Sequence, residues 1–282
     1  MYRAGAGNGS APAQPGAVYS LPEGIHVGLD PRVLWTPPYG GWLVEGILTT
    51  LRLTGVAILG STLLAIVVSM MRMSTLRSVS MPARAYVYFF RNTPFPVQVL
   101  FWYFGAPHLI PERFLEWLYA GDFEFLAALV ALILYTAAYI AEHFRSGISA
   151  IPRSQMESAL SSGMSYIQAM SYVILPQAFR ISLPPLISEY LTIAKNSSVA
   201  MIIGVAEAMT MARRVESYSF RAFEAFGAVT LFYLSLSLLT SFVLNWYNRR
   251  YLALITADER GKKRRKRPIG QAKRGLGWAG RP

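Results

Sequence analysis

Residues 123–141 read FEFLAALVALILYTAAYIA, an apolar run in which Glu124 is the only charged side chain. A helix needs about 20 predominantly apolar residues to cross the ~30 Å hydrocarbon layer of a membrane, and this run is close to that length. The composition of the 282-residue chain agrees, since 53% of its residues are hydrophobic and 15% are charged. Such a chain is too apolar for an ordinary soluble domain. The sequence therefore predicts an all-α, polytopic membrane protein.

Four further segments share the length and apolar character of this run. One of them, residues 85–104, is interrupted by Arg91 and two prolines, so we expect it to pack against protein there. In total we expect about five transmembrane helices, at residues 53–71, 85–104, 123–141, 183–205 and 225–244.

The two ends of the chain differ from its middle. Residues 1–40 are rich in Gly, Ala and Pro and lack the basic start and apolar core of a secretory signal, so we expect a flexible, uncleaved tail. Residues 41–250 form the expected transmembrane domain. Residues 251–282 carry most of the net charge of +12. We expect this basic tail to face the cytoplasm and to bind anionic lipid headgroups, and we expect no nucleic acid partner.

Several kinds of site are excluded by what the sequence lacks. It has no cysteine, so disulfides and thiolate metal sites are ruled out. Its three histidines do not have the spacing of a helical metal site. No P-loop motif for nucleotide binding occurs. We therefore expect no metal, no cofactor and no catalytic residue in this chain, and we do not expect it to be an enzyme.

Charges in the short connecting segments predict the orientation, because basic residues near the ends of membrane spans stay on the cytoplasmic side. Three arginines follow residues 53–71, whereas three acidic residues and one arginine follow residues 85–104. We expect the N-terminus outside, residues 145–182 in the cytoplasm and the C-terminus in the cytoplasm. The arginines of residues 206–223 are an exception to this alternation.

The segment between the third and fourth apolar runs predicts two short helices joined by a sharp corner. Ser154 and Glu157 have the spacing of a capping box, in which each side chain bonds an unpaired backbone N–H of the first turn. Gly163 can adopt the left-handed backbone angle that ends this helix. A second capping box at residues 165–168 starts another helix, which we expect to stop at Pro176.

This helix pair, residues 154–176, also has an apolar face. Met156, Ala159 and Leu160 have helical spacing and would be exposed unless a partner covers them. One interpretation is a docking face for a partner subunit. The alternative is an ordinary amphipathic loop that rests on the lipid headgroups.

The helix pair also resembles a known signature. Its pattern E-x-A-x-x-x-G, followed by I-L-P, is similar to the EAA loop of permease subunits in bacterial ABC importers. Ser158 replaces the usual second alanine. Three stretches, over about residues 45–250, resemble the polar amino acid permeases: FFRNTPFPVQVLFWYFGAP (89–107), YIAEHFRSGISAIP (139–152) and LPPLISEYLTIAKNSSVAMIIGVAE (183–207). The residues of the signature are Glu157, Ala159, Gly163, Ile174, Leu175 and Pro176.

The resemblance implies a transport subunit of the bacterial inner membrane. Separate ABC ATPase subunits, which carry ATP and Mg²⁺, would dock on the helix pair, and an external solute-binding protein would deliver the solute. A second copy of the chain, or a homologous permease, would complete the channel. Glu157 and Gly163 would set the shape of the helix pair, and Met156, Ala159 and Leu160 would contact the ATPase. The rival interpretation is a gated channel, or a membrane anchor that recruits a soluble partner.

The fourth apolar run contains a polar stripe. Lys195 lies eleven residues past Pro184, which is about 16 Å along a helix. A lysine near mid-membrane is costly unless it faces protein or water. We interpret the stripe as the lining of a solute path in which Lys195 binds a carboxylate; the alternative is that Lys195 only pairs with Glu142 or Glu189. The stripe comprises Ser188, Glu189, Thr192, Lys195 and Asn196.

The resemblance also indicates the charge of the solute. Many amino acid permeases read K-D-[ST]-S here, whereas this chain reads Lys195-Asn196-Ser197-Ser198. Without the aspartate, the lysine favours an anionic solute. The chain resembles glutamate and aspartate permeases most, and a permease for glutamine or histidine is the alternative. For Glu142 the resemblance suggests gating or packing, against an ordinary glutamate at the membrane interface.

Overall fold

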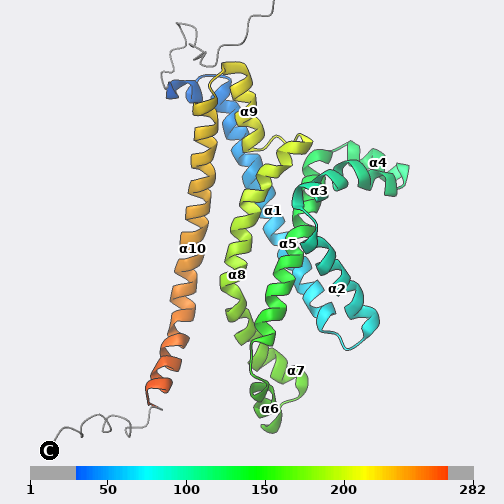
Figure 1. The fold of residues 1–282 in the computed structure, drawn as a ribbon, viewed down its shortest axis with the longest axis vertical. Helices are drawn as coiled ribbons and strands as arrows, with labels where there is room; N and C mark the ends of the chain where they lie inside the picture. The colour runs from blue at the N-terminus through cyan, green and yellow to red at the C-terminus, as the bar shows by residue number, and fades with distance from the viewer. Residues whose placement is uncertain (1–29, 266–282) are drawn as a thin grey trace, which may run out of the picture. The chain divides into compact units, whose positions relative to one another are not determined.

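The computed structural model describes residues 30–265, and most of these residues are helical (Figure 1). The chain divides into two compact units, residues 1–30 and 31–282, and the described helices belong to the second. No strand occurs in the described residues, which confirms the predicted all-α class. The helices are α1 (Tyr39–Met73), α2 (Arg77–Asn92), α3 (Phe95–Leu100), α4 (Glu112–Tyr119), α5 (Phe123–Ser149), α6 (Arg153–Ser161), α7 (Tyr166–Ala169), α8 (Leu175–Asn196), α9 (Ala208–Ser219) and α10 (Ala222–Arg265).

Three helices have the length and apolar composition that can cross a membrane: α1, α5 and the Ala222–Val243 part of α10. They contain three of the five predicted spans. Along α10 the apolar side chains are mostly exposed, as expected for a helix that meets lipid or a second subunit. These side chains include Leu231, Leu234, Leu238, Leu239 and Phe242.

The other two predicted spans are not single helices of this kind. Residues 85–104 are divided at Thr93, which is extended between α2 and α3. The cause is Pro94, because a residue before proline is pushed out of the helical conformation. Residues 183–205 are divided between α8 and the 3-10 turn Ser197–Ile203 that continues it.

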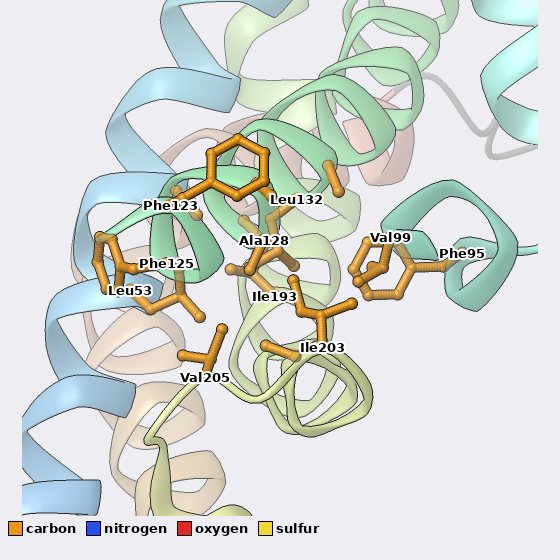
Figure 2. Packing of buried hydrophobic residues seen from close by; sticks show 14 residues of the cluster. Leu53, Phe95, Val99, Phe123, Phe125, Ala128, Leu132, Ile193, Ile203 and Val205 are labelled. Carbon is orange, nitrogen blue, oxygen red and sulfur yellow. The ribbon is translucent and has the colours of Figure 1, made fainter. Parts of the chain in front are cut away.

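Helix α5 is the centre of the packing, with α1, α2 and α8 against it (Figure 1). Small side chains fill the contact between α1 and α5, which allows the two backbones to approach closely. On α1 these are Ala57, Ser61 and Ala65, all fully buried. Larger side chains from several elements form one apolar cluster near one end of this contact (Figure 2). They include Leu53, Phe95, Val99, Phe123, Leu132, Ile193 and Ile203.

The contact between α5 and α8 depends on one glycine. A Cβ atom on Gly147 would clash with Ser182 Oγ and lie 2.8 Å from the carbonyl oxygen of Ala178. Ser182 Oγ in turn lies 3.1 Å from the carbonyl oxygen of His143 and 2.9 Å from that of Ala178, so it can donate a hydrogen bond to either. Since no side chain fits at Gly147, the residue is required for the two helices to touch.

A buried carboxylate joins α9 to α10. Glu207 is fully buried and caps α9, accepting hydrogen bonds from the backbone N–H groups of Met209 (2.9 Å) and Thr210 (2.7 Å). The hydroxyl of Tyr233 on α10 donates to the same carboxylate at 2.8 Å. Burial raises the pKa of Glu207, although these donors oppose the shift. On α1, Thr50 Oγ1 accepts from the N–H of Ala208 at 3.0 Å, so α9 is bonded to two long helices.

We predict that Gly147→Ala separates α5 from α8 and destabilises the protein by about 1–3 kcal/mol, the usual cost of overpacking. Thermal unfolding of the detergent-solubilised protein would measure this as a lower melting temperature. The matched control is Gly55→Ala in α1, where an added Cβ meets nothing within 4 Å. An equal melting temperature for the two variants would contradict the proposed contact.

Candidate functional site

The first helix of the predicted pair, α6, does not have the expected cap. It begins at Arg153, with Pro152 before it and no capping side chain. Ser154 therefore lies in the first turn of α6 and not at the N-cap. From there its hydroxyl cannot accept a hydrogen bond from the unpaired backbone N–H groups of that turn. The predicted capping box of Ser154 and Glu157 is wrong, and Glu157 is an exposed residue on α6.

The corner and the second cap agree with the sequence. Gly163 has φ +86°, the left-handed angle predicted for it, and follows the end of α6. Ser165 and Gln168 form the second capping box: Ser165 Oγ accepts from the Gln168 N–H at 3.3 Å, and the Gln168 side chain accepts from the Ser165 N–H at 2.9 Å. The two helices are thus joined at a fixed corner.

The second helix of the pair does not stop at Pro176, which corrects the prediction. After α7 the backbone passes through a π-helical turn, Met170–Ile174, directly into α8 at Leu175. Pro176 is tolerated there because it lies in the first turn of α8, where its missing N–H is not needed. The backbone is therefore helical without a break from Tyr166 to Asn196.

The predicted apolar docking face is only partly exposed. Ala159 is 6% exposed, and Met156 is half-buried against a small cluster that contains Ile151 and Ile174. These contacts hold α6 against the turn that precedes α8. The chain itself therefore covers part of the apolar face of α6, which helical spacing alone could not predict. Leu160 is 43% exposed. The exposed apolar side chains of the pair and the turns after it are Leu160, Met164, Tyr166, Ile167, Tyr172 and Leu175.

The predicted polar stripe lies along α8, toward the end remote from the helix pair. Ser188 and Lys195 are exposed, and Thr192 and Asn196 are half-buried. Thr192 Oγ1 donates to the carbonyl oxygen of Ser188 at 2.9 Å. The stripe is therefore accessible rather than closed within the packed helices.

The remaining member of the stripe, Glu189, bonds to α5. Its Oε1 lies 2.9 Å from Nε2 of His143. Among the side chains that the structure describes, Lys195 forms no ion pair with a carboxylate. The alternative in which Lys195 only pairs with Glu142 or Glu189 is therefore wrong for this structure. Sequence reasoning missed His143 because we considered the histidines only as metal ligands.

Glu142 is the centre of an ionic cluster. Its Oε2 accepts from Arg72 Nη1 of α1 at 2.5 Å, and its Oε1 accepts from Arg145 Nη2 at 2.5 Å. Nη1 of Arg91, near the end of α2, lies 4.0 Å from the same carboxylate. Glu142 thus bonds α5 to α1 through Arg72, which agrees with a packing role. Sequence reasoning also missed Arg72 and Arg91 as site residues, although arginines beside apolar runs are a signal of such a role.

The described residues show no metal site. The side chains that are described include no group of three or more His, Cys, Asp or Glu that could hold a metal ion. What the arrangement offers instead is charge on accessible helix faces. A cation on α8 and a cluster of arginines around Glu142 can attract and orient an anion.

Residues 43–253 match the family described as "Binding-protein-dependent transport system inner membrane component". The chain belongs to this family. The match confirms the resemblance to importer permeases that the sequence motifs gave, and it agrees with the arrangement of long apolar helices around α5.

Known proteins of this type are similar over most of the chain. It is 39% identical over 198 residues to the probable amino-acid ABC transporter permease protein PatM of Vibrio harveyi, covering 70% of this chain and 86% of that protein. It is 34% identical over 217 residues to the glutamate/aspartate import permease protein GltJ of Escherichia coli strain K12, covering 75% and 88%. A crystal structure of an amino acid ABC transporter with histidines has a TM-score of 0.70 at 31% identity, covering 79% and 99%. Further relatives are named for glutamine, arginine and octopine.

We predict that Glu142→Gln destabilises the protein by about 3 kcal/mol, because the mostly buried Arg72 then loses its counter-charge. Thermal unfolding in detergent would report the loss. Glu112→Gln, at an exposed position on α4, is the matched control and should change the free energy of unfolding by no more than about 0.5 kcal/mol. If both variants melted at the temperature of the unmodified protein, Glu142 would not hold the cluster together.

Proposed function

We propose that this chain is the permease subunit of an ATP-driven amino acid importer and that its solute is acidic, glutamate or aspartate. The proposal that the solute is acidic rests on Lys195. It lies exposed on α8 without an ion-pair partner in the described residues, and Asn196 follows it in place of the aspartate of related motifs. A lysine without a counter-charge attracts a carboxylate and repels a cationic solute. The similarity to the glutamate/aspartate permease GltJ supports the same solute.

A permease for another polar amino acid, such as glutamine or histidine, is the second candidate. It is favoured by the range of names among the relatives, which include a probable glutamine permease at 36% identity. Membership of the importer family favours both candidates over a gated channel or a membrane anchor.

The proposed assembly contains several chains in the bacterial inner membrane. Two permease subunits, either identical or homologous, enclose the path, and an external solute-binding protein delivers the amino acid. ABC ATPase subunits dock from the cytoplasm and hold ATP and Mg²⁺. In this arrangement the N-terminus lies outside and the C-terminus lies in the cytoplasm, as the charges of the connecting segments favour.

We assign the coupling to the ATPase to the helix pair. Its exposed apolar side chains, such as Leu160 and Ile167, offer a surface that a partner can cover, and Gly163 fixes the corner between α6 and α7. The unbroken helix from Tyr166 to Asn196 supports a mechanical role, since a displacement at the corner would be carried along α8 to Lys195. Movement driven by the ATPase would thus change the exposure of the polar stripe.

For the solute, we predict that Lys195→Gln lowers glutamate uptake by the reconstituted complex about tenfold or more, because a charge-assisted bond to the carboxylate is lost. Asn196→Asp restores the K-D-S-S pattern and should weaken the preference for glutamate over glutamine. The measurement is uptake of labelled glutamate with unlabelled competitors. Competition by arginine that equals competition by glutamate would contradict an acidic solute.

For coupling, we predict that Gly163→Val abolishes co-purification of the ATPase and solute uptake, because valine strains the left-handed corner. Gly204→Val is the matched control: Gly204 also has a positive φ, +89°, and open space around it, but lies beyond the other end of α8. The control should retain the ATPase. Equal retention by both variants would exclude the corner as the docking element.

A further inference from the structure

A polar cavity of about 280 Å³ lies among α1, α2 and α5, and is lined by residues from all three helices. It is separate from the polar stripe, since none of its lining residues belongs to α8. Three of these residues are charged and belong to the ionic cluster: Arg72, Arg91 and Glu142. The lining residues with charged or polar side chains are Arg72, Tyr88, Arg91, Asn92, Tyr139 and Glu142.

The cavity has an excess of positive charge. Glu142 is its one carboxylate, and both oxygens of Glu142 are already occupied, Oε2 by Arg72 and Oε1 by Arg145. Nη1 of Arg91 lies 4.0 Å from Oε2, which is beyond hydrogen-bonding distance. Three guanidinium groups therefore share one counter-ion, and the charge of Arg91 is the least well balanced.

Two arginines at the cavity also have unused donors. Arg72 Nε is buried and has no hydrogen-bond partner among the described residues. The guanidinium of Arg91 lies over the ring of Tyr139, 5.2 Å from its centroid, and its side chain is 40% exposed. A buried donor without a partner is costly, and guanidinium donors bind planar oxyanions with two parallel bonds. The exposed guanidinium of Arg91 can therefore reach an oxyanion in this cavity, and the charge of the more buried Arg72 adds to the attraction.

We propose that the cavity binds a carboxylate of the transported solute, with Arg91 and Arg72 as donors and with Asn92 and Tyr88 as neutral polar contacts. This inference rests on the proposed function, and it adds a binding site on α1, α2 and α5 to the stripe on α8. The exposed Arg91 would be the first group that the carboxylate meets. Because it stacks on Tyr139 and makes only a 4.0 Å ion pair with Glu142, its guanidinium can turn toward an incoming anion without breaking a hydrogen bond.

The test is equilibrium binding of labelled L-glutamate to the purified complex in detergent. It compares variants at two arginines of α2. We predict that Arg91→Gln weakens binding about tenfold or more, because a charge-assisted bond is lost, and that Arg91→Lys keeps part of the affinity. Arg84→Gln is the matched control, since Arg84 is exposed on the same helix and does not line the cavity. Elution on size-exclusion chromatography would show that each variant is folded.

Equal affinities for Arg91→Gln and Arg84→Gln would overturn the site. A second outcome would also overturn the site. In it, binding of inorganic phosphate or of an anionic lipid depends on Arg91, whereas binding of glutamate does not, so the cavity holds a phosphate group. The proposed function fails differently. If the complex took up glutamine and not glutamate, the proposal of an acidic solute would be refuted. The same variants could then be tested with glutamine, whose α-carboxylate would still show whether Arg91 binds a carboxylate.

Discussion

The close contact of α5 with α8 is the constraint on which the rest of the structure depends. At Gly147 the backbone of α5 lies so near Ser182 and Ala178 that no side chain fits. This contact fixes α8 just beyond the point where it leaves the helix pair. The helical backbone runs from Tyr166 to Asn196, through a π-helical turn at Met170–Ile174 and past Pro184 and Pro185, and so connects the corner at one end with the polar stripe at the other.

Some charged groups in this fold join helices, and others remain available to a solute. Three glutamates are of the first kind: Glu142 binds α5 to α1, Glu189 bonds to α5 from α8, and Glu207 joins α9 to α10. Unpaired charge is costly in apolar surroundings, so such pairs hold each carboxylate in one geometry. Lys195 and Arg91 are of the second kind, because neither has a hydrogen-bonded carboxylate in the described residues.

The sequence predicted the features that depend on local chemistry. The apolar runs predicted the long helices. The corner at Gly163 and the cap at Ser165 were also predicted, because each depends only on a few neighbouring residues. It did not predict the burial of Ala159, the passage of the helix through Pro176 or the cluster of Arg72 around Glu142. The burial of Ala159 and the cluster around Glu142 depend on which other segment covers a face, and helical periodicity carries no information about that. The helix passes Pro176 for a local reason, since this proline lies in the first turn of α8.

The central claim is that the corner between α6 and α7 lies in the cytoplasm, where an ATPase can move α8. It can be tested directly because the chain has no cysteine, so a single thiol introduced by Ser161→Cys is the only one to label. Ser161 is exposed at the end of α6. The account predicts that a membrane-impermeant maleimide labels this thiol in inside-out vesicles and leaves it unlabelled in intact spheroplasts. Labelling in intact spheroplasts would place the corner on the outer face and contradict the account.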